Sequence, residues 1–510
     1  MEKERSKAGA FLKSERMSST VLTAAIIVLI IAINIAMYAL SGMFGLLYTS
    51  AEEDKVVLTG NTDQLFEEAI AQKKKVKINF CFPARDDLTT HQTGAFVLKT
   101  AEEYVAAYPE FIEIDYVNLI TRRNAKGEDI SEKIKTWQGS KEDGTYNYLA
   151  KGSVVFECGD NFKVVTDTYT SAAFADFYIL DSSGNAMAYN GESFMAAMIH
   201  WVTVKDHPKA YFTMGHSEQF DRTFLTLLTS AGYVVDTVDL KTEEVPDDAE
   251  LLIISNPVSD FQKAAVGVDV RTEIDRLETY TNDGGNLYVS LDPYVKDLKV
   301  LEGFLADKGI EYSTTNVDGA EVRNIVKDSD NAITTDGFTL VAELADNDIA
   351  NSIDKTLSKY SDGHVIVREA AALKLSGTAV PVLVSTSSSS LEAGGEEVDG
   401  EGSYAIAACA KVKGDRNKVA SIFVVSSIYA TVADSLVTNG YSNTDFFYSL
   451  FENFYGNSGM PYGCDLMIAD TYVLENLTMG TARLYTAIIM AIPATVAILG
   501  AVVVIKRKNR

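Results

Sequence analysis

Cysteine is scarce in this chain, which has four cysteines among its 510 residues. They lie far apart, with no C-x-x-C pair and no cluster of cysteine and histidine at zinc-binding spacing. The sequence therefore predicts no structural zinc site, and we expect small buried side chains instead. A disulfide between Cys81 and Cys158 stays open, because it requires that their two strands share a sheet. The other two are Cys409 and Cys464.

Two sequence motifs of catalysis are also missing. The chain contains no G-x-x-x-x-G-K-[ST] segment, so it is not itself a nucleotide-driven motor. It contains no G-x-S-x-G elbow for a nucleophilic serine either. Any ATPase that works with this protein must therefore be supplied by another chain.

Positive charge is in short supply. The chain has 45 Lys and Arg against 71 Asp and Glu, which gives a net charge of −26. The short segments at both ends are basic, so the part between them is more acidic than the whole chain. Binding of nucleic acid needs a basic face that meets the phosphates. We therefore expect no nucleic-acid partner.

Charge is absent from two long stretches. Residues 17–51 contain no charged side chain, and residues 21–47 form a predicted transmembrane helix. About 20 apolar residues suffice to cross the hydrocarbon core. A second such run covers residues 484–505. A cleaved signal peptide is the alternative for the first run, but the run is longer than usual for one and no small-residue cleavage site ends it.

Basic residues flank the terminal side of both apolar runs. This pattern predicts that the two tails, residues 1–20 and 506–510, are cytoplasmic. The body between the runs then lies outside the cytoplasm. We therefore expect a protein that crosses the plasma membrane twice and carries its folded parts on the extracytoplasmic side.

The first folded part is predicted at residues 52–204. Its elements follow the order strand, helix, strand, and then strand, strand, helix. Pro109 ends the longer early helix, and Gly159 begins a tight turn between two short strands. The expected helices are 62–71, 93–108 and 194–204, and the expected strands are 76–82, 111–117, 153–158 and 162–166.

This order of elements resembles a thioredoxin-like domain. Redox chemistry in such a domain needs a thiol of low pKa at the start of the first long helix. Residues 83–93, which lead into that helix, contain no cysteine. We therefore expect the scaffold without the redox activity.

The second folded part, residues 208–456, is organised around residues 209–221. A short apolar strand at 210–214 is followed by Gly215, a polar loop and an apolar-periodic helix at 220–231. Strand, glycine turn and helix are typical of an open α/β sheet, in which ligands bind at the carboxyl ends of the strands. The polar loop lies at such an end.

The alternation of strands and helices continues after this unit. Strands at 233–240, 250–255 and 286–291 alternate with helices at 271–282 and 295–308. This pattern predicts a parallel sheet covered by helices on both faces. Further along, we expect an inserted β-rich or irregular lobe at 316–360, strands at 365–375, 379–385, 403–412 and 418–425, a mobile solvated loop at 387–402, a helix at 443–455 and a linker at 457–483.

Five residues at two strand ends are the candidate ligand-binding residues: Gly215, His216, Ser217, Glu218 and Asp292. One interpretation is structural, in which the glycine permits the turn and the polar side chains cap the helix. Binding of a small ligand is the second, and catalysis with His216 as a base is the third. A metal site is not expected, because His216 and Glu218 are only two ligands and no other histidine is close in sequence.

Several stretches together resemble the GldG-like family of gliding-motility and ABC-transporter auxiliary proteins. The layout of an apolar leader, two extracytoplasmic domains and a closing apolar run is also similar. This sequence departs from the family pattern at Ser217, where glycine is frequent, and at Ser426-Ser427, where a Gly-Asp-Ser turn is frequent. The matching residues are Tyr189-Asn190-Gly191-Glu192, the segments 194–204 and 209–218, Ala231-Gly232-Tyr233, Val245-Pro246-Asp247-Asp248-Ala249 and the segments 251–257 and 280–293.

The resemblance implies an α/β fold in which a thioredoxin-like domain precedes an open parallel-sheet domain of the class I amidotransferase-like, flavodoxin-like kind. It implies a non-catalytic auxiliary subunit of an ABC-type transport system, with ATPase and permease subunits as partners and no cofactor. In class I glutamine amidotransferases a cysteine stands on a strand-to-helix elbow. The corresponding position here is near residues 291–293, which contain no cysteine. We therefore expect no enzyme activity.

Two alternatives stay open. One is a cell-surface hydrolase or amidotransferase-like enzyme that uses His216 and Glu218. The other is a structural scaffold of the envelope or of a motility apparatus. A pocket that joins His216 and Glu218 to Asp292 or to a serine would favour the enzyme, whereas a packed strand end would count against it.

Overall fold

The computed structural model describes residues 56–468, apart from positions 90, 92, 141–145, 167–172, 182, 220, 263–270, 361–362, 415–417, 438–440 and 456–458. The described residues belong to one compact unit. Both expected membrane helices, residues 21–47 and 484–505, lie outside the described residues. None of the helices that are described combines the length and the apolar character that crossing a bilayer requires.

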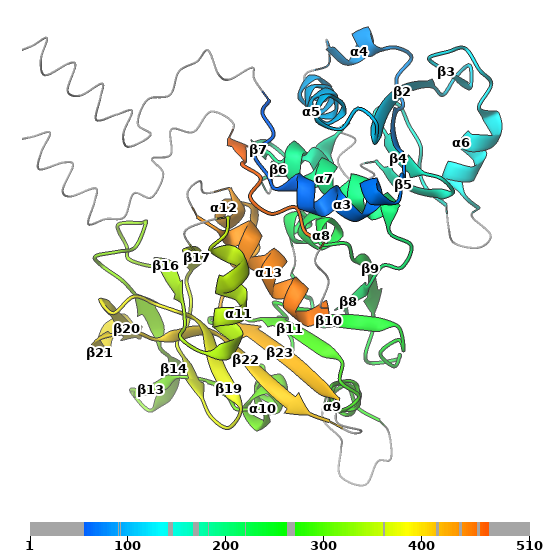
Figure 1. Ribbon diagram of the computed structural model, residues 1–510. Helices are drawn as coiled ribbons and strands as arrows, with labels where there is room; N and C mark the ends of the chain where they lie inside the picture. Colours follow the sequence, from blue (N-terminus) through cyan, green and yellow to red (C-terminus); the bar gives the residue numbers. More distant parts are fainter. Residues whose placement is uncertain are drawn as a thin grey trace, which may run out of the picture. The chain divides into compact units, whose positions relative to one another are not determined.

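A five-stranded sheet forms in the early part of the chain, coloured blue to cyan in Figure 1. Its strands are β1 (Val76–Phe80), β2 (Ile112–Asn118), β3 (Arg123–Asn124), β4 (Val154–Cys158) and β5 (Asn161–Val165). The strand order is β3-β2-β1-β4-β5, with β1 parallel to β2 and antiparallel to β4. The helices of this part are α3 (Thr62–Ala71), α4 (Arg85–Thr89), α5 (Gly94–Ala107), α6 (Ser131–Gln138) and α7 (Gly191–Thr203).

The core of this part is built as the sequence predicts. Val76, Ile78 and Phe80 of β1 are fully buried, and they share one hydrophobic cluster with residues of α5 and α7. Helix α7 is buried on nearly all sides, and its own apolar residues, Met195 and Met198 among them, are enclosed. The order β-α-β followed by β-β-α is therefore present. Helices α4 and α6 and strand β3 are additions that the sequence pattern did not predict.

All four cysteines are free thiols. Strands β1 and β4 do share a sheet, but their antiparallel register keeps Cys81 away from Cys158. The Cys81 N–H donates to the Ser153 carbonyl, just before β4 begins, whereas Cys158 is the last residue of β4. Five residues of extended chain span about 16 Å, and a disulfide needs Cα atoms within about 7 Å.

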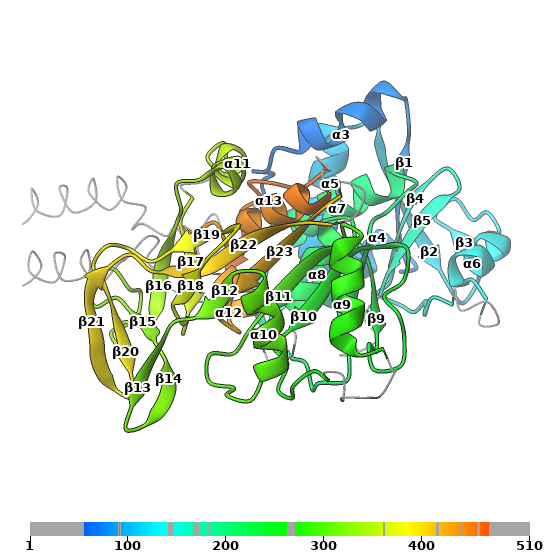
Figure 2. The same ribbon diagram turned by 90° about the horizontal axis from the view of Figure 1, so that it is seen from below.

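A nine-stranded mixed sheet forms the larger part of the molecule (Figure 2). Its strands are β8 (Lys209–Thr213), β9 (Val234–Val238), β10 (Ala249–Ser255), β11 (Asn286–Ser290), β16 (Thr339–Leu344), β17 (Val365–Arg368), β19 (Ala379–Val384), β22 (Ala405–Lys413) and β23 (Val419–Val425). Their order is β17-β16-β19-β22-β23-β11-β10-β8-β9. The five strands from β23 to β9 are parallel, whereas β22, β19, β16 and β17 pair antiparallel. The parallel sheet predicted from the sequence is thus one half of a mixed sheet.

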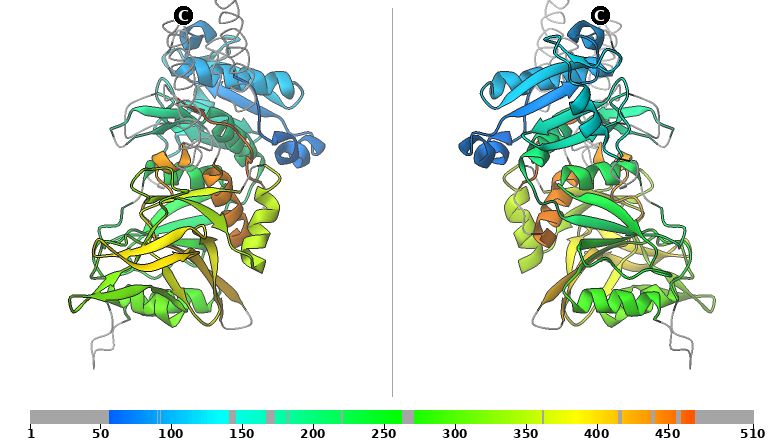
Figure 3. Two further views of the ribbon diagram at one scale, coloured as in Figure 1. Left: turned by 90° about the vertical axis from the view of Figure 1, so that its left-hand side faces the viewer. Right: turned by 90° about the vertical axis from the view of Figure 1, so that its right-hand side faces the viewer.

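Helices cover both faces of this sheet (Figure 3). They are α8 (Arg222–Ser230), α9 (Glu273–Asn282), α10 (Lys299–Asp307), α11 (Asp348–Leu357), α12 (Ala433–Leu436) and α13 (Asn443–Tyr455). On β8, Phe212 packs in one cluster with residues of α8, α11 and α13. Its neighbour Tyr211 packs in another with residues of α9 and α10. Alternate residues of each buried strand therefore serve opposite layers.

Two predictions for the second part are wrong. Residues 387–402 form a hairpin of β20 (Ser389–Ala393) and β21 (Glu396–Gly402), not a mobile loop. Ser389, Leu391 and Ala393 alternate as buried residues, and Gly394 turns the chain with a φ of +63°. Because the segment is rich in Ser, Gly and Glu, the two-residue alternation of buried side chains was not recognised from the sequence. The predicted strand 365–375 breaks at Glu369, whose φ is +50°, into β17 and β18 (Leu373–Leu375).

Smaller sheets complete the fold. The inserted lobe, predicted as β-rich or irregular, contains short strands and helix α11. A small three-stranded sheet has the order β24-β7-β6. Its strands β6 and β7 directly precede α7 in sequence and follow a 3-10 turn, η1 (Ala175–Phe177), whereas β24 comes from the end of the described chain. The remaining strands are β6 (Tyr178–Leu180), β7 (Ala186–Tyr189), β12 (Ile310–Tyr312), β13 (Thr314–Val317), β14 (Ala320–Arg323), β15 (Ile325–Lys327) and β24 (Met467–Ile468).

The two ends of the described chain meet in a group of contacts that we call the terminal clasp: Thr59, Gly60, Glu192, Cys464 and Asp465. The buried Glu192 carboxylate accepts hydrogen bonds from the N–H groups of Thr59 and Gly60, both at 2.6 Å. Thr59 Oγ1 donates to Glu192 at 2.9 Å and accepts from the Asp465 N–H at 2.9 Å. A Cβ on Gly60 would stand 2.3 Å from Cys464 Sγ, so the two segments are in close contact.

Candidate functional site

The five residues predicted from the sequence follow two strands of the nine-stranded sheet. Gly215 to Glu218 form the loop after β8, and Asp292 lies two residues after β11. Strand β10 separates β8 from β11 in the sheet. Both positions are carboxyl ends of parallel strands, as the sequence analysis predicts.

His216 is buried in a closed setting. Its side chain is 1% exposed, and its ring stacks on Phe261 with centroids 4.0 Å apart and planes at 9°. Its Nε2–H donates to Glu273 Oε1 at 2.6 Å, and the Glu273 side chain is also 1% exposed. Burial of a carboxylate is costly unless hydrogen bonds compensate for the lost water. His216 therefore supplies the hydrogen bond that compensates one of the two Glu273 oxygens for its burial.

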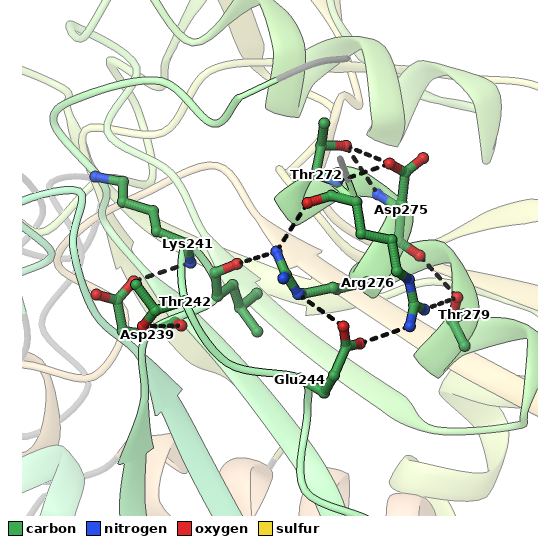
Figure 4. Close-up of polar contacts among 10 residues, drawn as sticks. Asp239, Lys241, Thr242, Glu244, Thr272, Asp275, Arg276 and Thr279 are labelled. Carbon is green, nitrogen blue, oxygen red and sulfur yellow. Dashed lines mark hydrogen bonds and ion pairs between the residues drawn. The ribbon is translucent and has the colours of Figure 1, made fainter. Parts of the chain in front are cut away.

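Helix α9 positions Glu273. The helix begins with a capping box, in which the Thr272 hydroxyl and the Asp275 carboxylate satisfy each other's backbone N–H groups (Figure 4). Glu273 is the first residue of the helix, and its second oxygen accepts from the Gln262 N–H at 2.7 Å. The cap thus fixes the first turn, and the first turn holds the carboxylate against the imidazole.

A second network ties the same helix turn to the connection after β9. Figure 4 shows Arg276 reaching Glu244 and the Leu240 carbonyl. The Arg276 Nε lies 3.1 Å from Glu244 Oε1, and Arg271 Nη1 lies 2.9 Å from the other oxygen of that carboxylate. Glu244 is half exposed, so solvent weakens these ion pairs. Their role is to hold the 240–244 connection beside the site.

The loop around His216 has an unusual backbone. Gly215 has a φ of +116° and Ser217 a φ of +57°. Glycine is free of strain in these conformations, whereas serine adopts the second one less readily. The Glu218 carboxylate accepts from the His216 N–H at 2.8 Å and so stabilises the turn. Ser217 is exposed, and Glu218 is half-buried.

The loop after β10 closes over His216. The N–H groups of Val258 and Ser259 donate to the His216 carbonyl at 2.9 and 3.1 Å. Phe261, in the same loop, covers the imidazole and is 3% exposed. Next to it, Asp260 accepts from the Val300 N–H at 2.8 Å and caps the start of α10. The loop therefore fills the end of the sheet with side chains.

Asp292 lies apart from this arrangement. Its carboxylate accepts from the Tyr294 N–H at 2.8 Å, and its carbonyl accepts from Arg323. Across the described residues, no hydrogen bond or ion pair joins Asp292 to His216 or Glu218. The five predicted residues therefore form two separate groups.

Two buried polar atoms of the His216 group lack hydrogen-bond partners among the described residues: His216 Nδ1 and Glu218 Oε1. A base must lie within hydrogen-bond reach of a nucleophile. No described hydroxyl or thiol bonds to either ring nitrogen of His216. The described residues contain no group of three or more His, Cys, Asp or Glu that could hold a metal ion. The arrangement fits a role in closing the sheet end.

Glu273 and Phe261 are the residues that sequence reasoning missed. Glu273 stands in the first turn of a predicted helix, where acidic residues are common because they favour the helix dipole. Its neighbour Asp275 fulfils that role as a cap. Nothing in the local pattern distinguishes the buried carboxylate from the capping one, since only the approach of the β8 and β10 loops buries Glu273.

The chain is similar to several solved structures. No protein-family model matches the chain, and no curated protein matches it. Among solved structures, the "mmIFT52 N-terminal domain" is 16% identical and is covered over 98% of its length by 49% of this chain, with a TM-score of 0.36. A ThuA-like protein from Bacteroides uniformis is 11% identical, with 97% of it and 51% of this chain covered and a TM-score of 0.31.

A glutamine amidotransferase from Thermotoga maritima is 10% identical. The likeness covers all of that chain and 50% of this one, with a TM-score of 0.29. These likenesses concern the fold alone. The chain has a mixed α/β fold whose solved neighbours include amidotransferase-like structures.

Proposed function

We propose that this protein is a non-catalytic, membrane-anchored auxiliary subunit of an ABC-type transport system, and that its body binds a partner or cargo outside the membrane. The proposal keeps the GldG-like resemblance as a prediction. In it, the five-stranded sheet is the core of a thioredoxin-like domain, and the nine-stranded sheet is the core of a class I amidotransferase-like domain. The strand order β2-β1-β4-β5 supports the first assignment.

The observation that carries the proposal is the terminal clasp. Thr59 follows the first predicted membrane run, and Asp465 lies within the predicted linker 457–483, which leads to the second. The buried Glu192 carboxylate holds Thr59, and the Asp465 N–H donates in turn to the Thr59 hydroxyl oxygen. A body with two membrane anchors must present both chain ends towards the same bilayer. The clasp meets that requirement, because it keeps the two ends of the body within hydrogen-bond distance of each other.

The filled end of the sheet supports a non-enzymatic role. A catalytic base must reach the substrate, but Phe261 stacks on the His216 ring and both side chains are almost fully buried. The thioredoxin-like part offers no redox centre either, since residues 83–93 contain no cysteine. Binding is therefore the function that these surfaces support best.

Recovery of the complex tests the proposal. We expect that the full-length protein, tagged and purified from its own membranes in mild detergent, brings down one ATPase and one permease chain in fixed ratio. Repeated recovery of the protein alone would contradict the proposal. A scaffold of the envelope or of a motility apparatus would instead give a stoichiometric complex that contains no ATPase.

Topology can be tested separately. Ile120 is 92% exposed in a turn after β2, so an Ile120→Cys variant presents a reactive thiol on the body. We expect a membrane-impermeant maleimide to label this variant on intact cells, above the background of the wild-type protein with its native cysteines. Labelling that appears only after lysis would place the body in the cytoplasm and contradict the proposal.

The hydrolase or amidotransferase-like alternative has one observation in its favour. The 2.6 Å hydrogen bond between His216 and Glu273 resembles the arrangement in which a carboxylate orients a catalytic histidine base. If His216 is a base, a His216→Gln variant loses turnover of ester or amide substrates. If the pair is structural, the wild-type protein shows no such turnover and the variant loses only stability.

A further inference from the structure

A cavity of about 570 Å³ lies away from the His216 loop. It is bordered by strand β6 and the turn after it, by the first two turns of α8, by the last residue of α12 and by the start of α13. Its volume is in the range of small-molecule sites, which is about 300 to 1,000 Å³. It lies where the segment before α7 meets the nine-stranded part, and such junctions are common places for ligands.

The floor of the cavity is apolar. Ile179, Leu227 and Leu436 line it, and each is at most 5% exposed. All three belong to the main hydrophobic cluster of the nine-stranded part, so the floor is fixed by packing that extends well beyond the cavity. An apolar ligand body that rests on this floor would be stabilised by the removal of its surface from water.

The ionic groups at the cavity favour positive charge. Asp181 and Asp221 line it, and so does Arg222. The Arg222 guanidinium pairs with Asp176, so its charge is offset by that carboxylate. Asp221 accepts from the Thr223 N–H at 2.7 Å as the N-cap of α8, and no ion pair neutralises it among the described residues. Hydrogen bonds from Asn185 lower the pKa of Asp181, so this carboxyl is ionised at neutral pH.

Two aromatic rings complete the lining. Tyr178, at the start of β6, and Tyr448, in α13, both border the cavity. The hydroxyl of Tyr178 donates to the Thr93 carbonyl at 2.8 Å, and that of Tyr448 bonds to Ser193 Oγ at 3.1 Å. Their polar ends are therefore engaged. Aromatic faces attract ammonium groups, and the combination of aromatic rings with carboxylates is typical of amine-binding sites.

We propose that this cavity binds a small cationic amphiphile, an amine whose apolar body rests on Ile179, Leu227 and Leu436 and whose ammonium group is attracted by Asp221 and Asp181. The inference does not depend on the proposed transport role. An anionic ligand of the same shape is repelled by the two carboxylates, and a neutral one gains only the apolar contact. The site therefore discriminates by charge.

The test uses three probes that share one apolar body: phenylethylammonium, phenylethanol and phenylpropanoate. Binding to the purified full-length protein is titrated by saturation-transfer NMR. We expect the ammonium probe to bind with a Kd below about 1 mM, in keeping with the affinity that so few atoms can supply. We expect phenylethanol to bind several-fold more weakly and phenylpropanoate to bind least.

A pair of variants locates the binding. Thr226 lines the cavity from α8, whereas Thr229, on the same helix and equally half-buried, does not. Thr226→Trp places an indole in the cavity and is expected to lower the affinity for phenylethylammonium at least tenfold. Thr229→Trp is the matched control and is expected to change it less than twofold. Because both variants are measured in the same detergent, their comparison also corrects for the signal of probe that partitions into detergent micelles.

A third variant isolates the charge. Asn is as good an N-cap as Asp, so Asp221→Asn keeps the start of α8 while it removes the carboxylate. We expect a loss of about fivefold for phenylethylammonium and none for phenylethanol, since one exposed charge contributes about 1 kcal/mol. Equal binding of the anionic probe, an unchanged affinity in Thr226→Trp, or no binding of any probe at millimolar concentration would each overturn the proposal.

Discussion

Asp445 supports the turn that leads into the terminal clasp, and its protonation gives a sharp test of the structure. The residue lies in the first turn of α13, is half-buried, and accepts from the Gly463 N–H at 3.2 Å. Burial raises the pKa of Asp445 to about 6, the nearby Asp465 adds to the increase, and the hydrogen bond from Gly463 opposes it. The perturbation is Asp445→Asn, which keeps an oxygen acceptor for Gly463 but cannot ionise.

The size of the effect follows from the difference between the two states. An unfolded aspartate has a pKa near 3.9, and each pH unit of difference corresponds to about 1.4 kcal/mol. A folded pKa of about 6 therefore corresponds to about 3 kcal/mol at most. Because the folded state binds the proton more tightly, this contribution to the free energy of unfolding is complete below about pH 4. It is lost as the pH rises through about 6.

The assay is denaturant unfolding of the purified protein between pH 4 and pH 8, with the wild type and the variant compared at each pH. We expect Asp445→Asn to equal the wild type within about 1 kcal/mol at pH 4 and to exceed it by about 1 to 3 kcal/mol at pH 7.5. Asp247→Asn, at an exposed position, is the matched control for the removal of one carboxylate. A variant that is less stable than the wild type at pH 7.5, or a constant difference across the range, would refute the reasoning.

Three further predictions concern the clasp, the His216 pair and a buried thiol. Gly60→Ala should lower the free energy of unfolding by about 1 to 3 kcal/mol, because the new Cβ would stand 2.3 Å from Cys464 Sγ. Adding Cys464→Ala in the same chain should restore most of the loss. If denaturant melts show no such rescue, the two segments are not in contact. His216→Ala should lower the free energy of unfolding by about 3 to 5 kcal/mol, because it removes the hydrogen-bond donor of the buried Glu273 carboxylate. Combining it with Glu273→Gln in a double-mutant cycle should recover part of this loss. Additive losses would contradict the pairing. Burial raises the pKa of the Cys409 thiol to about 11, so iodoacetamide at pH 8 should modify Cys409 only in denaturant. Rapid labelling of the native protein, detected by mass spectrometry, would show that the sheet is open at this position.

Local periodicity was sufficient to predict most elements, because burial of one face imposes a pattern on the residues of that element alone. The helix predicted at 443–455 is α13 (Asn443–Tyr455), and the hairpin predicted around Gly159 is β4 and β5. The hairpin at 387–402 was not predicted, because its pattern of buried residues is weak in the sequence. Its outward residues are so rich in Glu and Gly that composition obscured the buried alternation of Ser389, Leu391 and Ala393.

The position of the candidate loop could be predicted, but its environment could not. A strand, a glycine turn and a helix place His216 at a sheet end whatever lies around it. Whether that end is open depends on the loop after β10, because Phe261 stacks on the imidazole. Asp292 and His216 both follow parallel strands, as the sequence predicts. Strand β10 lies between their strands, however, and each residue has its own partners.

The sequence by itself determined the apolar runs, the acidic body, the alternation of strands and helices, and the absence of nucleophile and phosphate-binding motifs, because these are properties of neighbouring residues. Only the tertiary structure decided which carboxylates are buried. Glu273 and Asp275 are two residues apart, yet one is enclosed against His216 and the other caps a helix in solvent. Thr59 and Asp465 are 406 residues apart and share a hydrogen bond. Such contacts depend on how distant segments pack, and no local pattern encodes them.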